Sequence, residues 1–215
     1  MKGGHSTDEN DCAVNDIKYH PTEEKLITAG ADGIVILWDV KTSQILQRFI
    51  GHKGLVLMVT WHPLGTRIAS CGLGKVVIIW DIITGEPVHL IKKIHKRGTY
   101  SIEYSCDGKS IVTGGLDHLI KVWSTEKEKV VDILKAHTDV VTSARFSPDG
   151  KYLASASLDK RVCLYYYKKS KFKYDSIDDS QSLKSLDERN NEMGFSRHNS
   201  FNNSSLSRQN SLITN

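Results

Sequence analysis

The sequence has few cysteines, and those it has do not form a recognisable site. The four thiols lie far apart, with no Cys-x-x-Cys pair and no histidine cluster at metal-ligand spacing, which argues against a zinc module. They are Cys12, Cys71, Cys106 and Cys163, and we interpret them as reduced thiols in the core. We expect neither a metal nor a cofactor.

The sequence also lacks a large excess of one charge sign and lacks long apolar runs. The 29 Lys and Arg residues and the 25 Asp and Glu residues are interspersed and leave a net charge of +4. The sequence therefore lacks the strongly basic composition that is typical of nucleic-acid-binding proteins. The N-terminal stretch MKGGHSTDEND turns acidic where a signal peptide needs apolar residues. No segment approaches the roughly 18 apolar residues of a membrane helix. We expect a soluble protein of the cytoplasm or nucleus, without membrane contact.

Local catalytic signatures are absent as well. The sequence contains no HExxH, no GxxxxGK[ST] and no isolated GxSxG. We therefore expect that the protein is not an enzyme.

What the sequence does contain is a repeat. The stretch GADGIVILWD (30–39) returns as GLGKVVIIWD (72–81), GLDHLIKVWS (115–124) and SLDKRVCLYY (157–166). The closing aromatics follow at intervals of 42, 43 and 42 residues, and another aromatic lies nineteen residues before each. The first series is Trp38, Trp80, Trp123 and Tyr165, and the second is Tyr19, Trp61, Tyr104 and Phe146.

Each unit reads as four short strands. In the second unit, apolar runs at 56–61, 67–72 and 76–81 are separated by turn formers, and a more polar strand follows at 87–94. A period of about 40 to 45 residues with four strands per unit is typical of a β-propeller blade. The sequence predicts an all-β propeller of four blades over residues 1–167, with the completeness of the last blade left open.

The pairs Trp38-Asp39 and Trp80-Asp81, with Gly51-His52 between them, resemble the signature of WD-repeat β-propellers, and the resemblance covers roughly residues 5–167. It implies a structural network in each blade: a His before the first strand, a Ser or Thr on the second, an Asp in the next turn, and the Trp. The implied sets are His5, Thr28, Asp32 and Trp38; His52, Ser70 and Trp80; His95, Thr113, Asp117 and Trp123; and His137, Ser155, Asp159 and Tyr165.

Two sets are incomplete and one is ambiguous. Gly74 stands where the second set needs an Asp, and Tyr165 replaces the Trp of the fourth, so these two networks should be weaker. His5 lies five residues further from its strand than its counterparts do, so either the intervening loop is an insertion or Asn10 takes its place. Because the set recurs with the blade period, we interpret its His, Ser and Asp as structural and not as a catalytic triad.

The number of blades leaves the architecture open. A fifth unit would place its aromatic near residue 207, where the sequence reads SLSRQNS. Four blades are the minimum for a closed propeller. The last strand of the fourth unit would have to come from the charged segment 169–175. Three hypotheses for the architecture remain: a four-bladed ring, a propeller completed by a second chain or by self-association, and part of a longer gene product.

Composition changes at about Lys168. Of the last 48 residues 11 are Ser and 7 are Asn, which predicts a disordered tail over 168–215. Two tail segments, FSRHNS and LSRQNS, resemble the recognition pattern of basophilic protein kinases, and chance is the alternative. The candidate phosphorylation sites are Ser200 and Ser211.

Function is expected on the loops that a propeller presents at its two ends. The resemblance implies that the residue before the structural Asp points outward from one face, and three of the four residues at this position are leucines. These predicted rim residues are Ala31, Leu73, Leu116 and Leu158. An apolar rim favours protein or peptide partners, and hence a protein-interaction scaffold or adaptor. The alternative is that each leucine packs into its own loop.

A second hypothesis is association with nucleic acid. One basic cluster lies between the second and third units, and another lies beside three consecutive tyrosines, 165–167, where cations and aromatics could hold phosphates and bases. The lysines and arginine are Lys92, Lys93, Lys96, Arg97, Lys168, Lys169, Lys171 and Lys173. Because charge runs are usually solvated surface, nucleic acid is the less favoured partner.

Overall fold

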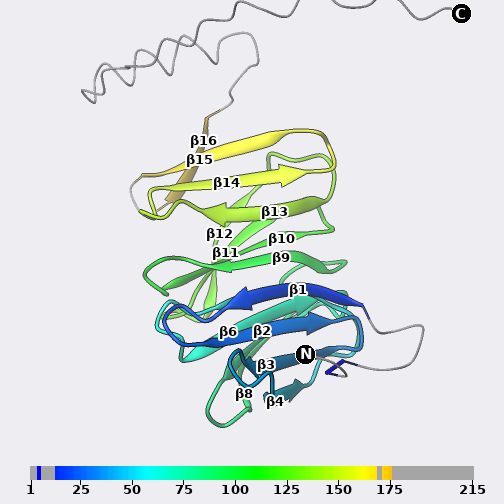
Figure 1. The fold of residues 1–215 in the computed structure, drawn as a ribbon. Coiled ribbons are helices and arrows are strands. Elements are labelled where there is room, and N and C mark those ends of the chain that lie inside the picture. Colours follow the sequence, from blue (N-terminus) through cyan, green and yellow to red (C-terminus); the bar gives the residue numbers. More distant parts are fainter. Residues whose placement is uncertain (1–3, 6–12, 169–170, 176–215) are drawn as a thin grey trace, which may run out of the picture. The chain divides into compact units, whose positions relative to one another are not determined.

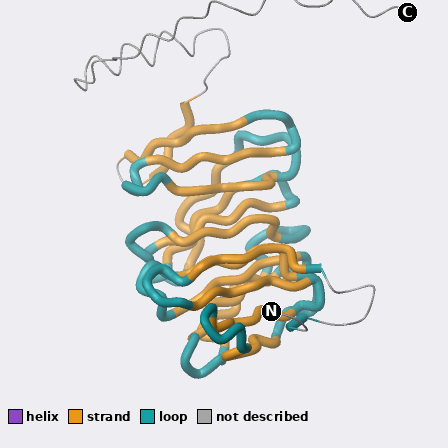
Figure 2. Tube along the Cα trace, viewed as in Figure 1, coloured by secondary structure: helices purple, strands orange, loops and turns teal. Residues whose placement is uncertain are grey.

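The computed structural model describes residues 4–5, 13–168 and 171–175, and this part of the chain contains strands and loops but no helix (Figures 1 and 2). The all-β prediction is therefore confirmed. Blade 1 comprises β1 (Val14–Tyr19), β2 (Lys25–Gly30), β3 (Ile34–Asp39) and β4 (Ile45–Ile50). Blade 2 comprises β5 (Val56–Trp61), β6 (Arg67–Gly72), β7 (Val76–Asp81) and β8 (Pro87–Lys92).

The remaining strands repeat this arrangement. Blade 3 comprises β9 (Thr99–Tyr104), β10 (Ser110–Gly115), β11 (Ile120–Ser124) and β12 (Lys129–Leu134). Blade 4 comprises β13 (Val141–Phe146), β14 (Tyr152–Ser157), β15 (Val162–Lys168) and β16 (Lys171–Asp175). In every blade the strands pair antiparallel in chain order, as tight turns between consecutive strands require.

The last blade has its fourth strand. β16 pairs with β15 from Lys171 opposite Lys168 to Asp175 opposite Leu164. This moves the end of the blade region from the expected residue 167 to residue 175, because backbone pairing with the edge of β15 does not depend on an apolar sequence. The tail predicted from 168 lies, from residue 176 onward, outside the described residues, as do Ser200 and Ser211.

The core consists of apolar layers between consecutive blades. In the first layer, Val35 and Leu37 on β3 belong to the same cluster as Val59 and Trp61 on β5. The layer between blades 2 and 3 includes Val77, Ile79, Ile102 and Trp123, and that between blades 3 and 4 includes Ile120, Val122, Val141 and Tyr165. Blades 2 and 3 thus each use one face toward the blade before them and the other toward the blade after them.

One cysteine departs from its predicted environment. Cys71 and Cys163 are buried, but Cys106 is exposed and is not a core thiol. It occupies the turn between β9 and β10, where the chain leaves the sheet. Cys12 lies outside the described residues.

Candidate functional site

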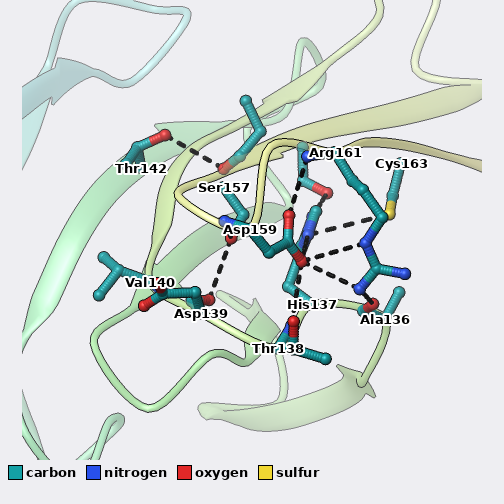
Figure 3. A network of polar contacts seen from close by, with 12 residues as sticks. Ala136, His137, Thr138, Asp139, Val140, Thr142, Ser157, Asp159, Arg161 and Cys163 are labelled. Atoms are coloured by element: carbon teal, nitrogen blue, oxygen red, sulfur yellow. Dashed lines mark hydrogen bonds and ion pairs between the residues drawn. The ribbon is translucent and has the colours of Figure 1, made fainter.

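The polar networks predicted for each blade connect its loops to its second strand. In blade 4, His137 Nε2 lies 2.8 Å from Ser155 Oγ, and His137 Nδ1 lies 2.9 Å from Asp159 Oδ2. Asp159 Oδ2 also accepts the Thr138 backbone N–H at 3.0 Å (Figure 3). The network fixes the loop before β13 against the turn after β14.

Arg161 adds a contact that the sequence analysis did not anticipate. Its guanidinium donates to Asp159 Oδ2 at 3.0 Å and to the Ala136 carbonyl at 2.7 Å (Figure 3). Burial acts to raise the pKa of Asp159, but the hydrogen bonds from Thr138, His137 and Arg161 outweigh it, and the pKa lies well below its ordinary value. Asp159 therefore stays ionised and stabilises this turn.

Blade 1 uses His5. Its Nδ1 lies 3.1 Å from both Asp32 carboxylate oxygens, its Nε2 lies 2.8 Å from Thr28 Oγ1, and the Trp38 indole N–H donates to the same hydroxyl at 2.9 Å. The structure therefore places His5 at the position for which Asn10 was the alternative, and Asn10 itself lies outside the described residues.

Blade 3 has the His and Asp contacts without the Trp contact. His95 Nδ1 lies 2.6 Å from Asp117 Oδ1, and His95 Nε2 lies 2.9 Å from Thr113 Oγ1. Trp123 is buried, but among the described contacts its indole N–H makes no hydrogen bond to Thr113, whose hydroxyl donates to the Lys121 carbonyl at 3.3 Å. The ring lies edge-on to His89 instead, with centroids 5.8 Å apart. The sequence had predicted all four members joined.

Blade 2 shows the reverse. The Trp80 indole N–H donates to Ser70 Oγ at 2.8 Å, and Ser70 Oγ lies 2.7 Å from His52 Nε2. Because Gly74 offers no carboxylate, His52 Nδ1 is buried without a hydrogen-bond partner. Burial lowers the pKa of His52 from 6.5 to about 4, so the ring is neutral near pH 7.

These networks stabilise the fold of each blade. Ser70, Thr113 and Ser155 are all buried, so their hydroxyls lie inside the sheets and not at a surface where a substrate could reach them. Each His instead joins a loop to a strand. Within the described residues, no group of three or more His, Cys, Asp or Glu side chains could hold a metal ion.

The predicted rim residues occupy equivalent turns. Each lies between the second and third strands of its blade and donates its backbone N–H to the loop before the first strand, as Leu116 does to Gly98 O at 3.1 Å and Leu158 to Val140 O at 3.0 Å. Leu73 is 41% exposed and Leu158 is 59% exposed. Leu116 and Ala31 are half-buried.

Basic residue types accompany the rim leucines. Two residues after them come Lys75, His118 and Lys160, each in the left-handed backbone region, with φ of 59°, 66° and 68°. Lys75 and Lys160 are exposed. These positions were not predicted from the sequence, although their two-residue offset from the leucines repeats with the blades. The rim therefore combines a leucine with a lysine in blades 2 and 4.

The two basic clusters differ in what lies beside them. Lys92, Lys93, Lys96 and Arg97 are exposed at the end of β8 and in the loop that follows. In the second cluster, Tyr165 is 1% exposed and belongs to the core layer between blades 3 and 4, so its ring cannot stack on a base. Lys169 lies outside the described residues.

Comparisons with known proteins agree with this geometry. The family model of the WD domain, G-beta repeat, matches residues 85–124 and 128–165, and that of the anaphase-promoting complex subunit 4 WD40 domain matches residues 3–64. The chain belongs to the WD-repeat family. The resemblance seen in the sequence is thereby confirmed.

Three relatives illustrate the range of WD-repeat proteins similar to this chain. Protein hir1 of Schizosaccharomyces pombe is 39% identical over an alignment of 92 residues, and the match covers 36% of this chain and 10% of that protein. U3 small nucleolar RNA-associated protein 12 of Saccharomyces cerevisiae is 25% identical over 185 residues, 79% of this chain and 19% of that protein. Cilia- and flagella-associated protein 52 of Bos taurus is 26% identical over 159 residues, 74% and 25% respectively. The chain spans a quarter or less of each.

Proposed function

We propose that this WD-repeat protein is a non-enzymatic scaffold that binds other proteins or peptides through the rim of blades 2 to 4. The observation that carries the proposal is the recurrence of leucine at one turn of three consecutive blades, exposed at Leu73 and Leu158. The turns are held by the networks beneath them, so the apolar side chains are presented by a rigid frame.

The charges on the rim indicate the kind of partner. Exposed Lys75 and Lys160 follow Leu73 and Leu158 by two residues, and no described ion pair neutralises either lysine. We infer that the partner segment carries apolar anchors with acidic residues close by, since charge complementarity speeds association and excludes wrong partners. The lysines would add rate and selectivity, and the leucines most of the affinity.

Location inside the cell belongs to the same proposal. It is supported by relatives whose names place them with nucleolar RNA and with cilia and flagella. None of the described residues forms a helix suited to crossing a membrane.

The rim hypothesis is tested by replacing Leu73, Leu116 and Leu158 with Ser. Exposed positions such as Leu73 and Leu158 usually change stability by less than about 0.5 kcal/mol each, and Leu116 is only half-buried, so the variant should fold. Its pull-down from cell extract should lose partners that the parent retains. The matched control is Leu64→Ser with Ile83→Ser. Both are exposed apolar residues on turns at the opposite ends of the strands, and this variant should retain the partners.

Two results would contradict the proposal. One is a soluble, folded triple variant that keeps every partner of the parent. The other is a triple variant that unfolds, which would show that the leucines pack into their own loops. Partners that both the parent and the rim variant release steeply as salt rises, and that prove to be RNA or DNA, would favour nucleic-acid association instead.

A further inference from the structure

The first strand of blade 1 exposes apolar residues that its counterparts bury. Tyr19 is 69% exposed, whereas the equivalent Trp61 and Tyr104, in blades 2 and 3, are 7% and 5% exposed. Val14 and Ile17 on the same strand are also exposed, while Val56 and Val59 at the same positions of β5 are fully buried. In blade 2 these positions contact blade 1, so in blade 1 they form the face that lacks a preceding blade.

Blade 4 exposes the opposite face. Val162 is 75% exposed, although the equivalent residues Val35, Val77 and Ile120 in the other three blades are completely buried. Those three residues lie in the layers against the following blade. Leu164, two residues further along β15, is half-buried, whereas its equivalents Leu37, Ile79 and Val122 are buried. Blade 4 therefore lacks a following blade.

These two free faces are the two halves of one interface. The layer between blades 1 and 2 combines Val35 and Leu37 on one side with Val56, Val59 and Trp61 on the other. At the free ends the corresponding residues are Val162 and Leu164 on blade 4, and Val14, Ile17 and Tyr19 on blade 1. The residue types match position by position, since β-branched, aliphatic and aromatic side chains recur on both sides. The interface that occurs three times within the chain is thus available once more between its ends.

The two faces do not cover each other within one chain. Strand contacts join blade 1 to blade 2, blade 2 to blade 3 and blade 3 to blade 4, and among the described strands no contact of comparable extent joins blade 4 to blade 1. In Figure 1, β9 of blade 3 lies between β13 and β1. Two exposed apolar sheet faces on one small domain indicate an association surface.

We propose that the occupant of these faces is a second copy of this chain, bound head to tail, with blade 4 of one copy on blade 1 of the other. A copy carries both halves of the interface, and the contact repeats the packing already present between consecutive blades. Two such junctions would close two chains into one ring of eight blades, within the range of about four to eight blades of closed propellers. The rim of each copy would then be part of a continuous ring.

The test measures the mass of the purified full chain by light scattering as its concentration is varied. The parent should be a dimer at high concentration. Ile17→Glu on blade 1 and Val162→Glu on blade 4 should each weaken dimerisation on the order of a hundredfold or more, because both junctions of a homodimer then bury a carboxylate. The control is Ile83→Glu, which changes another exposed apolar residue, on the turn between β7 and β8, and it should dimerise like the parent.

Mixing the two variants distinguishes this geometry from others. In a mixture, one junction pairs the unaltered blade 4 of Ile17→Glu with the unaltered blade 1 of Val162→Glu, while the other junction carries both carboxylates and stays open. An open heterodimer held by the intact junction should therefore form, which neither variant forms alone. Circular dichroism melting checks that each variant folds, and Val14→Lys serves as a second blade 1 variant if Ile17→Glu does not.

Three outcomes overturn the proposal. The parent stays monomeric up to about 100 µM, far above the micromolar affinities of stable pairs; one of the two Glu variants dimerises like the parent, which indicates a contact between identical faces; or the mixture remains monomeric. The rim variant tests the scaffold function separately, because it should dimerise normally whether or not it binds partners.

Discussion

Blades 2 and 3 are neighbours that each make a different half of the same polar network. Blade 2 joins Trp80, Ser70 and His52 but has Gly74 in place of the carboxylate, whereas blade 3 joins Thr113, His95 and Asp117 but leaves Trp123 out. Both histidines nevertheless occupy the same place between loop and strand. The position of the ring therefore depends on the contact with the Ser or Thr hydroxyl, which the two blades share.

The networks of blades 2 and 3 also differ in the electrostatic environment of their histidines. The pKa of His95 is lowered by burial, and Asp117 opposes this shift, while nothing opposes it at His52. Burial acts to raise the pKa of Asp117, but the Lys96 backbone N–H and His95 outweigh it, so the carboxylate stays ionised. Blade 3 thus gives a partner to the ring nitrogen Nδ1 that blade 2 leaves buried without one.

The largest loss of stability is expected from removing Trp80, the member of the network that bonds to Ser70 in blade 2 but has no counterpart bond among the described contacts of blade 3. Trp80 is fully buried, lies against Phe49 with ring centroids 5.6 Å apart, and donates to Ser70. Trp80→Ala should cost about 3–5 kcal/mol, a large share of the roughly 5–15 kcal/mol that stabilises a domain. Urea unfolding followed by circular dichroism measures this loss. A melting curve like that of the parent would show that the blade 2 network does not support the fold.

Removing the carboxylate of blade 3 should have the next largest effect. Asp117→Ala leaves His95 Nδ1 and the Lys96 N–H without their acceptor, at a cost of about 1–3 kcal/mol for a buried group. The matched change in blade 2, Gly74→Ala, should be nearly neutral, because an added Cβ would lie 3.8 Å from the Lys53 backbone nitrogen, an ordinary van der Waals distance. Equal losses of unfolding free energy in the two variants would remove the distinction between the blades.

Acid should affect blade 2 through His52. The pKa in the folded protein is about 4, below the ordinary 6.5 that the unfolded chain should have, so the unfolded state binds the proton first as the pH falls. The stability contributed by this group is present above pH 6.5 and decreases toward pH 4, by about 2.5 kcal/mol at pH 4.5. NMR titration of the His52 ring measures the pKa directly, and a midpoint near 6.5 would contradict the prediction.

The smallest expected effect is a gain. Gly74→Asp should supply the missing acceptor, because the position has room for a Cβ and the Lys53 N–H lies where Lys96 N–H meets Asp117 in blade 3. We expect stabilisation of about 1 kcal/mol and a higher pKa for His52, which would reduce the sensitivity to acid. Thermal melting at pH 7 and pH 5 measures both. A variant with the parent's melting temperature and pH dependence would show that blade 2 does not use the site.

The sequence by itself determined the repeat, the strand order and most of each network, because the 42- or 43-residue period and the apolar runs between turn formers are local properties of the chain. It also predicted the consequence of Gly74, since glycine has no side-chain carboxylate to bond His52. It could not choose between His5 and Asn10, because the number of residues in a loop does not determine where its side chains return to the sheet.

Only the tertiary structure decided the remaining features, all of which depend on what packs across a blade. Trp123 lies edge-on to His89, and the Thr113 hydroxyl donates to the Lys121 carbonyl. β16 paired despite its charges, since backbone groups at a sheet edge make the same hydrogen bonds for any side chain. Tyr19 and Trp61 occupy equivalent positions in the repeat, yet one is exposed and the other buried. Burial depends on the presence of the next layer, and a repeating sequence carries the same signal whether or not that layer is there.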